Sequence, residues 1–277
     1  MSTNHQTDID IILSHRHHEG ADFWTTPDNR LLKGGAFSAY ASALLLLELG
    51  VPPSDPILQT VADMFFAAWK EDGRFKLYPK GGILPCQTAY ALVLLCRMGY
   101  QADTRIQKTF RHFLDTPYTD GGWRCNKFFY GRGPETEFSN PLPTLNVLNA
   151  FRFSSYINNE PALDRAVEFL LAHWTIRRPI GPCQYGMGKR FMQVEYPLMD
   201  YNLFHYVYVL SFYNKAKTDE RFLEAFRALQ EKVVDGMIVV ENTPRKYAQL
   251  EFCKKGKPSQ LATMRYEEIL ENMKEYV

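Results

Sequence analysis

The feature that most constrains this fold is a sequence repeat with a period of about 50 to 60 residues. In each repeat, a two-residue turn ending in glycine is followed by a loop and then by an apolar stretch of helical length. The turns are Glu19-Gly20, Asp72-Gly73, Asp120-Gly121, Ile180-Gly181 and Asp235-Gly236. Such a period is typical of tandem helical hairpins, and because it covers most of residues 1–277 we expect one all-α domain.

One type of predicted helix is amphipathic. In residues 55–69, apolar side chains recur every three or four positions, and Asp55 and Pro56 provide a side-chain cap and a proline at the first helical position. We expect five such outer helices, each with one exposed face. They cover residues 8–17, 55–69, 104–114, 161–174 and 219–233.

The second type is apolar nearly all round, as residues 36–49 and 85–98 show most clearly. The later counterparts are residues 143–156, 197–213 and 259–276. A helix without a polar face must be covered on every side. These inner helices therefore predict an α/α toroid of five or six hairpins, with an inner barrel wrapped by the outer helices. An open superhelical stack is the alternative.

The connections from outer to inner helices are long, and a toroid would place them all at one end. They cover residues 20–34, 71–84, 116–142, 175–196 and 234–258. Lysine and arginine outnumber aspartate and glutamate in these loops, and the positive ends of the inner-helix dipoles point the same way. With aromatic residues making up 14% of the chain, this pattern predicts a basic, aromatic-lined funnel.

Composition excludes several classes of protein. A net charge of +1 does not favour nucleic-acid binding, and the longest apolar runs are too short to span a membrane. The first ten residues contain no secretory signal pattern. Five widely spaced cysteines without a CxxC pair indicate reduced thiols. We therefore expect a cytoplasmic location.

Three segments carry a resemblance to a known superfamily. The turn at residues 120–123 (DGGW), its weaker counterpart at 72–75 (DGRF) and the helix opening at 85–90 (PCQTAY) resemble the repeats of terpenoid cyclases and protein prenyltransferases, the squalene cyclase-like group. The resemblance implies an α/α toroid and a hydrophobic isoprenoid ligand in an aromatic cavity. It also implies possible cyclisation or transfer of that ligand, with an anionic diphosphate head group.

The catalytic motifs of that superfamily are absent from this sequence. Neither the DxDD motif of the cyclases nor the DDxxD motif that holds magnesium diphosphate occurs. The zinc pattern of prenyltransferases has its nearest match at Glu251 and Cys253, but no histidine follows, and His205 lies earlier. The resemblance therefore bears on fold more directly than on activity.

Candidate catalytic residues come from a short list of acids, namely Asp120, Glu137, Glu195 and Asp200. Asp200 stands in an otherwise apolar stretch one turn before His205, so a carboxylate and an imidazole could share a helix face. Buried there, the carboxylate would have a raised pKa and could act as a general acid. We predict catalytic roles for Asp200, His205 and Asp120; the alternative is that Asp200 caps a helix and His205 is a core residue.

Ligand binding is predicted for aromatic and basic residues of the loop end. These are Trp123, Arg124, Tyr185, Tyr196, Tyr201, Lys80 and Lys257. Their rings could stabilise cationic charge and their cations could bind an anionic group. A purely structural role is the alternative for Trp123, since Trp123 and Trp24 occupy equivalent positions after their turns.

A metal site is a weaker hypothesis. Four cysteines fall near the predicted rim, at Cys86, Cys125, Cys183 and Cys253. Together they could bind zinc, or one of them could be a nucleophile with a lowered pKa, but their spacing matches no zinc motif.

Two other functions remain open from the sequence. One is a carbohydrate-active enzyme, which would place two carboxylates about 5 to 10 Å apart across a groove. The other is a non-catalytic helical-repeat module that binds a partner. A closed aromatic pocket with one acid would instead favour a terpenoid ligand.

Overall fold

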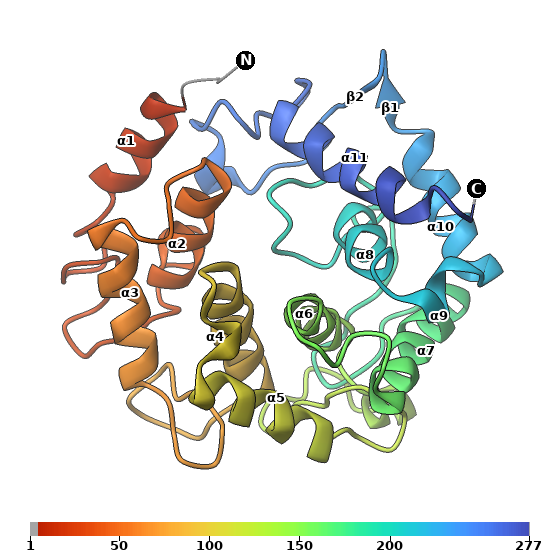
Figure 1. Cartoon of the computed structure of the whole chain (residues 1–277), viewed down its shortest axis with the longest axis horizontal. Helices are drawn as coiled ribbons and strands as arrows, with labels where there is room; N and C mark the ends of the chain where they lie inside the picture. Colours follow the sequence, from red (N-terminus) through yellow and green to blue (C-terminus); the bar gives the residue numbers. More distant parts are fainter. Residues whose placement is uncertain (1–4, 277) are drawn as a thin grey trace. The chain divides into compact units, whose positions relative to one another are not determined.

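The computed structural model describes residues 5–276, and the regular secondary structure of these residues is almost entirely helical (Figure 1). The helical pattern predicted from the sequence is confirmed. The five helices expected to be outer are α1 (Gln6–Ser14), α3 (Pro56–Ala67), α5 (Thr104–Asp115), α7 (Pro161–Ile176) and α10 (Glu220–Gln230). The five expected to be inner are α2 (Ala39–Glu48), α4 (Pro85–Arg97), α6 (Pro141–Phe151), α8 (Leu203–Leu210) and α11 (Gln260–Met273).

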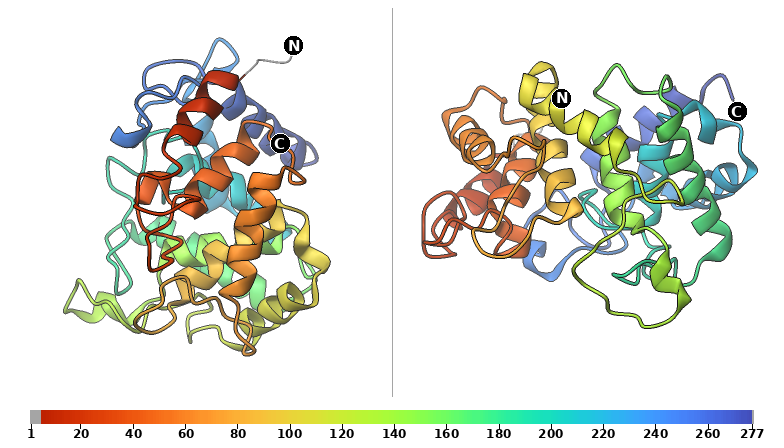
Figure 2. Two further views of the ribbon diagram at one scale, coloured as in Figure 1. Left: turned by 90° about the vertical axis from the view of Figure 1, so that its left-hand side faces the viewer. Right: turned by 90° about the horizontal axis from the view of Figure 1, so that it is seen from below.

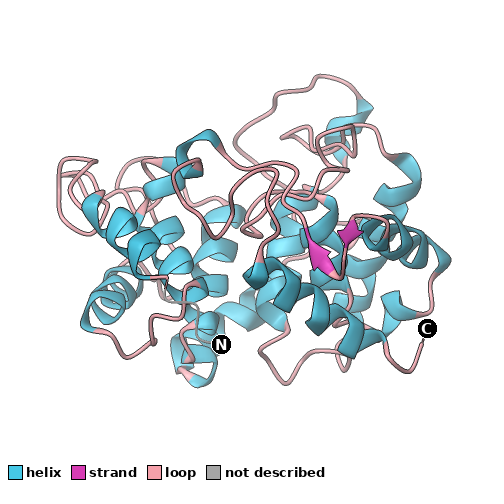
Figure 3. Cartoon of the chain, turned by 90° about the horizontal axis from the view of Figure 1, so that it is seen from above, coloured by secondary structure: helices cyan, strands magenta, loops and turns pink. Residues whose placement is uncertain are grey.

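The remaining elements are short. A two-stranded antiparallel hairpin joins β1 (Val233–Val234) to β2 (Met237–Ile238) across the last repeat turn (Figure 3). The short helical elements are α9 (Asn214–Lys217), η1 (Gly35–Phe37), η2 (Tyr100–Ala102), η3 (Pro134–Glu137) and η4 (Arg245–Tyr247). In the part of the chain that the structure describes, no helix combines the length and the apolar character needed to cross a bilayer.

The chain divides into two compact units. The amino-terminal unit contains the chain up to His112 together with Pro244–Phe252, and the carboxy-terminal unit contains Phe113–Thr243 and the chain from Cys253 onward. The course of each segment can be followed by colour in Figure 2. In the first unit, α2 packs against α1, α3 and α4; in the second, α8 packs against α6, α10 and α11.

Burial explains why the sequence contains two types of helix. Every residue of α6 and of α8 is buried, and so are nine of the ten residues of α2. The helix α11 differs from the other expected inner helices because it buries one face and leaves Met264 and Leu270 exposed. Complete burial therefore accounts for the apolar stretches of α2, α6 and α8, whereas α11 is amphipathic.

The glycines of two repeat turns lie against the backbone of the following outer helix. Gly73 (φ +85°) and Gly121 (φ +93°) both adopt left-handed backbone conformations. A Cβ atom at Gly73 would lie 2.9 Å from the carbonyl oxygen of Lys108 on α5, and one at Gly121 would lie 2.7 Å from that of Arg165 on α7. The glycine of the repeat is therefore required twice over, for its conformation and for close packing.

A second repeated contact links three of the five turns to the next inner helix. Three residues after the aspartate of the turn, a backbone amide donates to the hydroxyl of a threonine at the fourth position of that helix. The pairs are Phe75 with Thr88 (3.1 Å), Trp123 with Thr144 (3.1 Å) and Ile238 with Thr263 (3.0 Å). Because this bond recurs three times, the threonine is part of the structural repeat, a signal that the sequence analysis missed.

The two equivalent tryptophans both anchor their loops. Nε1 of Trp24 donates to the carbonyl oxygen of Ile12 at 2.9 Å, and Nε1 of Trp123 donates to that of Phe113 at 3.2 Å. Both rings are almost fully buried. Their indole N–H groups are thus satisfied by the end of the preceding outer helix, in agreement with a structural role.

A late segment of the chain completes the amino-terminal unit. The backbone amides of Glu251 and Phe252 donate to the two carboxylate oxygens of Asp8 on α1, at 2.9 and 3.0 Å. The hydroxyl of Tyr247 donates to the carbonyl oxygen of Ala36 at 2.8 Å. Asp8 is only 3% exposed, so these two amides supply hydrogen bonds that water cannot supply.

The close approach at the second turn leads to a testable prediction. Gly121→Ala should lower the free energy of unfolding by about 3–4 kcal/mol, because it adds a backbone clash to the strain of a left-handed residue. Gly236→Ala is the matched control, since Gly236 also has positive φ (+79°) but has no atom near its Cβ position. It should cost about 1–2 kcal/mol. Urea unfolding measures both, and equal losses would refute the role of packing.

Candidate functional site

Two carboxyl groups meet in the loop between α7 and α8. The Glu195 side chain is 2% exposed and hydrogen-bonds to the side chain of Asp200, which is 52% exposed. Nη2 of Arg190 lies 3.4 Å from the Glu195 carboxylate and 3.8 Å from that of Asp200. Nδ2 of Asn242 also donates to Glu195. A buried acid is thus joined to an exposed acid beside an exposed cation.

Backbone pairing holds the buried acid in place. Residues 194–195 lie alongside residues 241–242, with Glu195 and Asn242 forming an isolated parallel bridge. The amides of Glu241 and Asn242 both donate to the carbonyl oxygen of Val194, at 2.9 and 3.0 Å. In return, the Glu241 carboxylate accepts from the Val194 amide at 2.8 Å. Two loops distant in sequence therefore fix the position of Glu195.

The environment of Glu195 favours its protonated form. Burial is the main cause, and the neighbouring Asp200 carboxyl adds to it, so that together they raise the pKa of Glu195 to about 7. The positive charge of Arg190 acts in the opposite direction but is weaker. A neighbouring carboxyl group disfavours the charged form of a buried acid. Near neutral pH Glu195 can therefore donate a proton and take one back.

Aromatic rings surround the residue that follows Asp200. The ring of Tyr201 lies 4.9 Å from that of Phe191, 6.0 Å from that of Tyr185 and 6.5 Å from that of Tyr206, measured between centroids. Its hydroxyl is 2.9 Å from Nδ1 of His173, and burial raises the pKa of that hydroxyl well above its ordinary value. The cluster offers apolar surface next to the carboxyl pair.

His173 acts as a neutral acceptor in this cluster. Its Nε2 is 3.1 Å from the carbonyl oxygen of Arg178, so Nε2 must donate and Nδ1 must accept from Tyr201. Burial is the main reason that the pKa of His173 is lowered to about 4. The imidazole is therefore uncharged at neutral pH.

His205 and Asp200 are related differently from the prediction. The helix α8 begins at Leu203, after Asn202 has capped it by accepting from the amide of His205, so Asp200 precedes the helix and shares no helix face with His205. Nδ1 of His205 is 3.0 Å from the backbone oxygen of Asp200, not its carboxylate. Burial lowers the pKa of His205 to about 4. The carboxyl group whose burial raises its pKa is that of Glu195.

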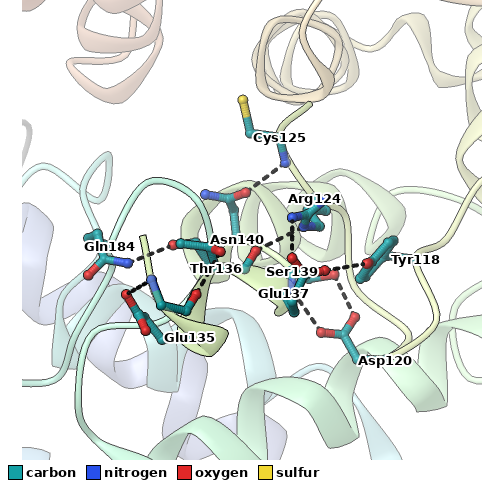
Figure 4. A network of polar contacts seen from close by, with 12 residues as sticks. Tyr118, Asp120, Arg124, Cys125, Glu135, Thr136, Glu137, Ser139, Asn140 and Gln184 are labelled. Carbon is teal, nitrogen blue, oxygen red and sulfur yellow. Dashed lines mark hydrogen bonds and ion pairs between the residues drawn. The ribbon is translucent and has the colours of Figure 1, made fainter. Parts of the chain in front are cut away.

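Asp120 organises the DGGW turn (Figure 4). Its carboxylate accepts from the amide of Gly122 at 3.2 Å, from the amide of Ser139 at 2.7 Å and from the hydroxyl of Ser139 at 2.6 Å. These bonds tie the turn to the residues just before α6. Asp120 thus performs a structural task here, and its predicted catalytic role stays a prediction.

Arg124 lies over the rings of two aromatic residues of the same loop. Its guanidinium carbon is 5.1 Å from the centroid of Tyr118 and 5.3 Å from that of Phe129. Nε donates to the carbonyl oxygen of Thr136 at 3.0 Å, and Nη2 lies 3.5 Å from the carboxylate of Glu137 (Figure 4). The Arg124 guanidinium therefore makes its hydrogen bonds and ring contacts within its own loop.

The other predicted ligand contacts fall into three groups. Trp123 and Tyr196 are core residues, at 2% and 0% exposure, and do not reach solvent. Tyr185 and Tyr201 are partly exposed and touch each other. Lys257 is exposed in the carboxy-terminal unit, and Lys80 is exposed in the amino-terminal unit. Of the seven residues, Tyr185 and Tyr201 lie in the aromatic cluster beside the carboxyl pair.

The cysteines do not gather into a metal site. Within residues 5–276, no group of three or more histidine, cysteine, aspartate or glutamate side chains is arranged to hold a metal ion. Cys125 and Cys183 contact each other in the carboxy-terminal unit, where Cys253 is also found, fully buried. Cys86 belongs to the amino-terminal unit. The four-cysteine zinc hypothesis therefore gains no support.

Several residues of the site were outside the sequence prediction. Glu195 was among the acids considered, but its pairing with Asp200 was not, and Arg190, Asn242 and His173 were missed. Asn242 lies 47 residues after Glu195, so no local pattern indicates the contact. Comparison with models of protein families gives no match, and comparison with curated proteins gives none either.

Proposed function

We propose that this protein binds an isoprenoid ligand at the loop between α7 and α8 and uses the Glu195–Asp200 pair as a proton donor to cyclise or transfer it. The observation that carries the proposal is a buried carboxyl group, Glu195, whose pKa is raised to about 7 and which contacts the exposed carboxyl group of Asp200. Asp200, which meets solvent, would face the ligand, while Glu195 holds the proton behind it. A general acid is most effective when its pKa is close to the working pH.

The neighbouring residues support the class of ligand. Tyr201 and Tyr185 present partly exposed aromatic surface, which suits an apolar chain and can stabilise cationic charge through the ring faces. Arg190 is 73% exposed and reaches both carboxylates with a single nitrogen, so its other donors can bind an anionic head group such as a diphosphate. An isoprenoid diphosphate combines these two features.

The alternatives fit the geometry less well. Glycosidases keep their two carboxylates roughly 5 to 10 Å apart to leave room for water or sugar. Glu195 and Asp200 are in direct hydrogen-bond contact, which suits proton sharing and leaves no such space. A non-catalytic binding module would have no need of a buried acid with a raised pKa. A sugar retained by the purified protein would favour the carbohydrate-active enzyme. A retained protein partner would favour the binding module.

We further propose that the hairpins close into an α/α toroid in a cytoplasmic protein. The support for closure is the segment Pro244–Phe252, which lies late in the chain and yet packs on α1 and η1. The support for the location is that none of the five cysteines, all within residues 5–276, forms a disulfide, which fits a reducing compartment.

The test of the proposed function begins with the purified full-length protein. Native mass spectrometry should reveal a retained isoprenoid, and calorimetric titration with farnesyl diphosphate should give a dissociation constant in the micromolar range, about −8 kcal/mol. Incubation should then yield free diphosphate. Absence of binding at millimolar concentrations, or a retained sugar or protein, would overturn the proposal.

The head-group contact is tested by a matched pair of variants. Arg190→Gln should weaken binding of farnesyl diphosphate about tenfold and leave binding of farnesol unchanged, because Arg190 pairs only with the charged group. Lys189→Gln removes the adjacent exposed cation and should change neither affinity by more than about twofold. Equal losses for both ligands, or for both variants, would show that Arg190 does not bind the head group.

A further inference from the structure

Two loops of the carboxy-terminal unit bring a pair of cysteines together. The amide of Tyr130 donates to the carbonyl oxygen of Pro182 at 2.8 Å, and the amide of Gly181 donates to that of Glu135 at 2.9 Å. These bonds align residues 125–135 with the turn at residues 180–185. As a result, the thiols of Cys125 and Cys183 are in hydrogen-bond contact.

The backbone at Cys125 is anchored to the residue that precedes α6. Its amide donates to Oδ1 of Asn140 at 2.7 Å, and Asn140 is fully buried just before α6 (Figure 4). On the other loop, Ile180 and Tyr185 pair through two backbone hydrogen bonds of 2.9 and 3.1 Å, which close a tight turn around Cys183. Cys125 is 6% exposed and Cys183 is partly exposed. A small reagent can therefore approach from the side of Cys183.

The environment of Cys125 favours a thiolate. The Cys183 thiol donates a hydrogen bond to it, the amides of Phe128 and Lys127 add two more, and the charge of Arg124 contributes, so that the pKa of Cys125 is lowered to about 5. A thiolate is the nucleophilic form of cysteine. At neutral pH, Cys125 is thus the thiol of this pair that favours the ionised form.

We propose that Cys125 and Cys183 form a peroxide-reactive thiol pair, with Cys125 as the attacking and Cys183 as the resolving cysteine. The site is distinct from the carboxyl pair and does not depend on the proposed isoprenoid activity. Low-pKa cysteines next to a second thiol are the usual sites of reversible oxidation.

The chemistry balances with hydrogen peroxide as the oxidant. The Cys125 thiolate attacks one peroxide oxygen, the O–O bond breaks, and the departing hydroxide takes a proton to become water, leaving a sulfenic acid. The sulfur of Cys183 then gives up its proton and attacks the Cys125 sulfur. The S–O bond breaks and a second water leaves. Two thiols have lost two electrons, and one peroxide has become two waters.

The experiment treats the reduced full-length protein with hydrogen peroxide at pH 7 and identifies cross-linked peptides by mass spectrometry. A disulfide between Cys125 and Cys183 should be the main product, and Cys125 should react at least tenfold faster than Cys86. A dominant cross-link between other cysteines, or equal rates at all thiols, would overturn the proposal. This part needs no variant and so does not depend on the folding of any variant.

Variants then assign the two roles. In Cys183→Ser, a sulfenic acid should accumulate at Cys125, where dimedone traps it. In Cys125→Ser, the fast oxidation of Cys183 by hydrogen peroxide should be lost. Cys96→Ser is the control, because Cys96 is buried in α4 of the other unit and its loss should leave the disulfide unchanged. Fast oxidation of Cys183 in the absence of Cys125 would reverse the assignment.

Discussion

Replacing Glu195 with glutamine should lower the turnover of farnesyl diphosphate by about 10²- to 10⁴-fold, the usual contribution of a positioned general acid. Glutamine keeps the size of the side chain and its ability to accept from Asn242, but it cannot share a proton with Asp200. Asp200→Asn should have a similar effect, because it removes the carboxyl group that meets solvent. Product formation measured by mass spectrometry at saturating substrate gives the rates.

Binding distinguishes this role from a structural one. Both variants should bind farnesyl diphosphate within about threefold of the unaltered protein and should retain its helical circular dichroism. Glu231→Gln is the matched control, since Glu231 is an exposed carboxylate at the end of α10. Unchanged turnover in Glu195→Gln would remove the pair from the mechanism. A similar loss in Glu231→Gln would point to a general effect of charge.

Acidification from pH 7 to pH 4 should destabilise the folded protein by several kcal/mol because of two buried histidines. The pKa values of His173 and His205 are lowered to about 4, whereas an unfolded histidine titrates near 6.5. A lowered pKa gives stability that is complete above pH 6.5 and is lost as the pH falls towards 4. The two shifts correspond to about 3 kcal/mol each.

Glu195 acts in the opposite sense. Its pKa is raised to about 7 from an ordinary value of 4.5, so its contribution to stability is complete below pH 4.5 and is lost as the pH rises through 7. The exposed Arg190 and Asp200 let solvent screen this contribution. Two nearly inaccessible imidazoles therefore outweigh one partly screened carboxyl, and the net effect of acid is a loss of stability.

Urea unfolding at pH 7, 5.5 and 4 measures the effect of acid. His205→Gln should reduce the loss on acidification by about half, because one of the two buried imidazoles no longer takes up a proton. His17→Gln serves as the control, since the His17 side chain is 73% exposed and its removal should leave the slope unchanged. If the unaltered protein, His205→Gln and His17→Gln all lost the same unfolding free energy between pH 7 and pH 4, the assignment to buried histidines would be wrong.

The helices could be predicted because their signals are local. Apolar spacing, together with Asp55 and Pro56 at the start of α3, places that helix to within two residues. The beginning of α8 was misplaced for a physical reason. Residues 197–202 form a partly buried loop, and the helix begins only where Asn202 caps it. Apolar character alone does not separate a buried loop from a buried helix.

The site could be predicted only in part, because its contacts connect distant segments. Acids in the loop before α8 were visible in the sequence, but which of them is buried depends on residues 241–242. The partner of Tyr201 is His173, 28 residues away on another element. Likewise, Cys125 meets Cys183 only because two loops exchange backbone hydrogen bonds. Such pairings arise from tertiary packing.

The position of residues 244–252 has a consequence for synthesis of the protein. Asp8 obtains its two buried amide partners from Glu251 and Phe252, so α1 cannot reach its final state until the ribosome has translated the codons of these two residues. Domains usually fold in order as they emerge. Here α1 must wait for a segment that follows it by more than 200 residues. A product truncated before Glu251 would leave the Asp8 side chain without its two amide donors.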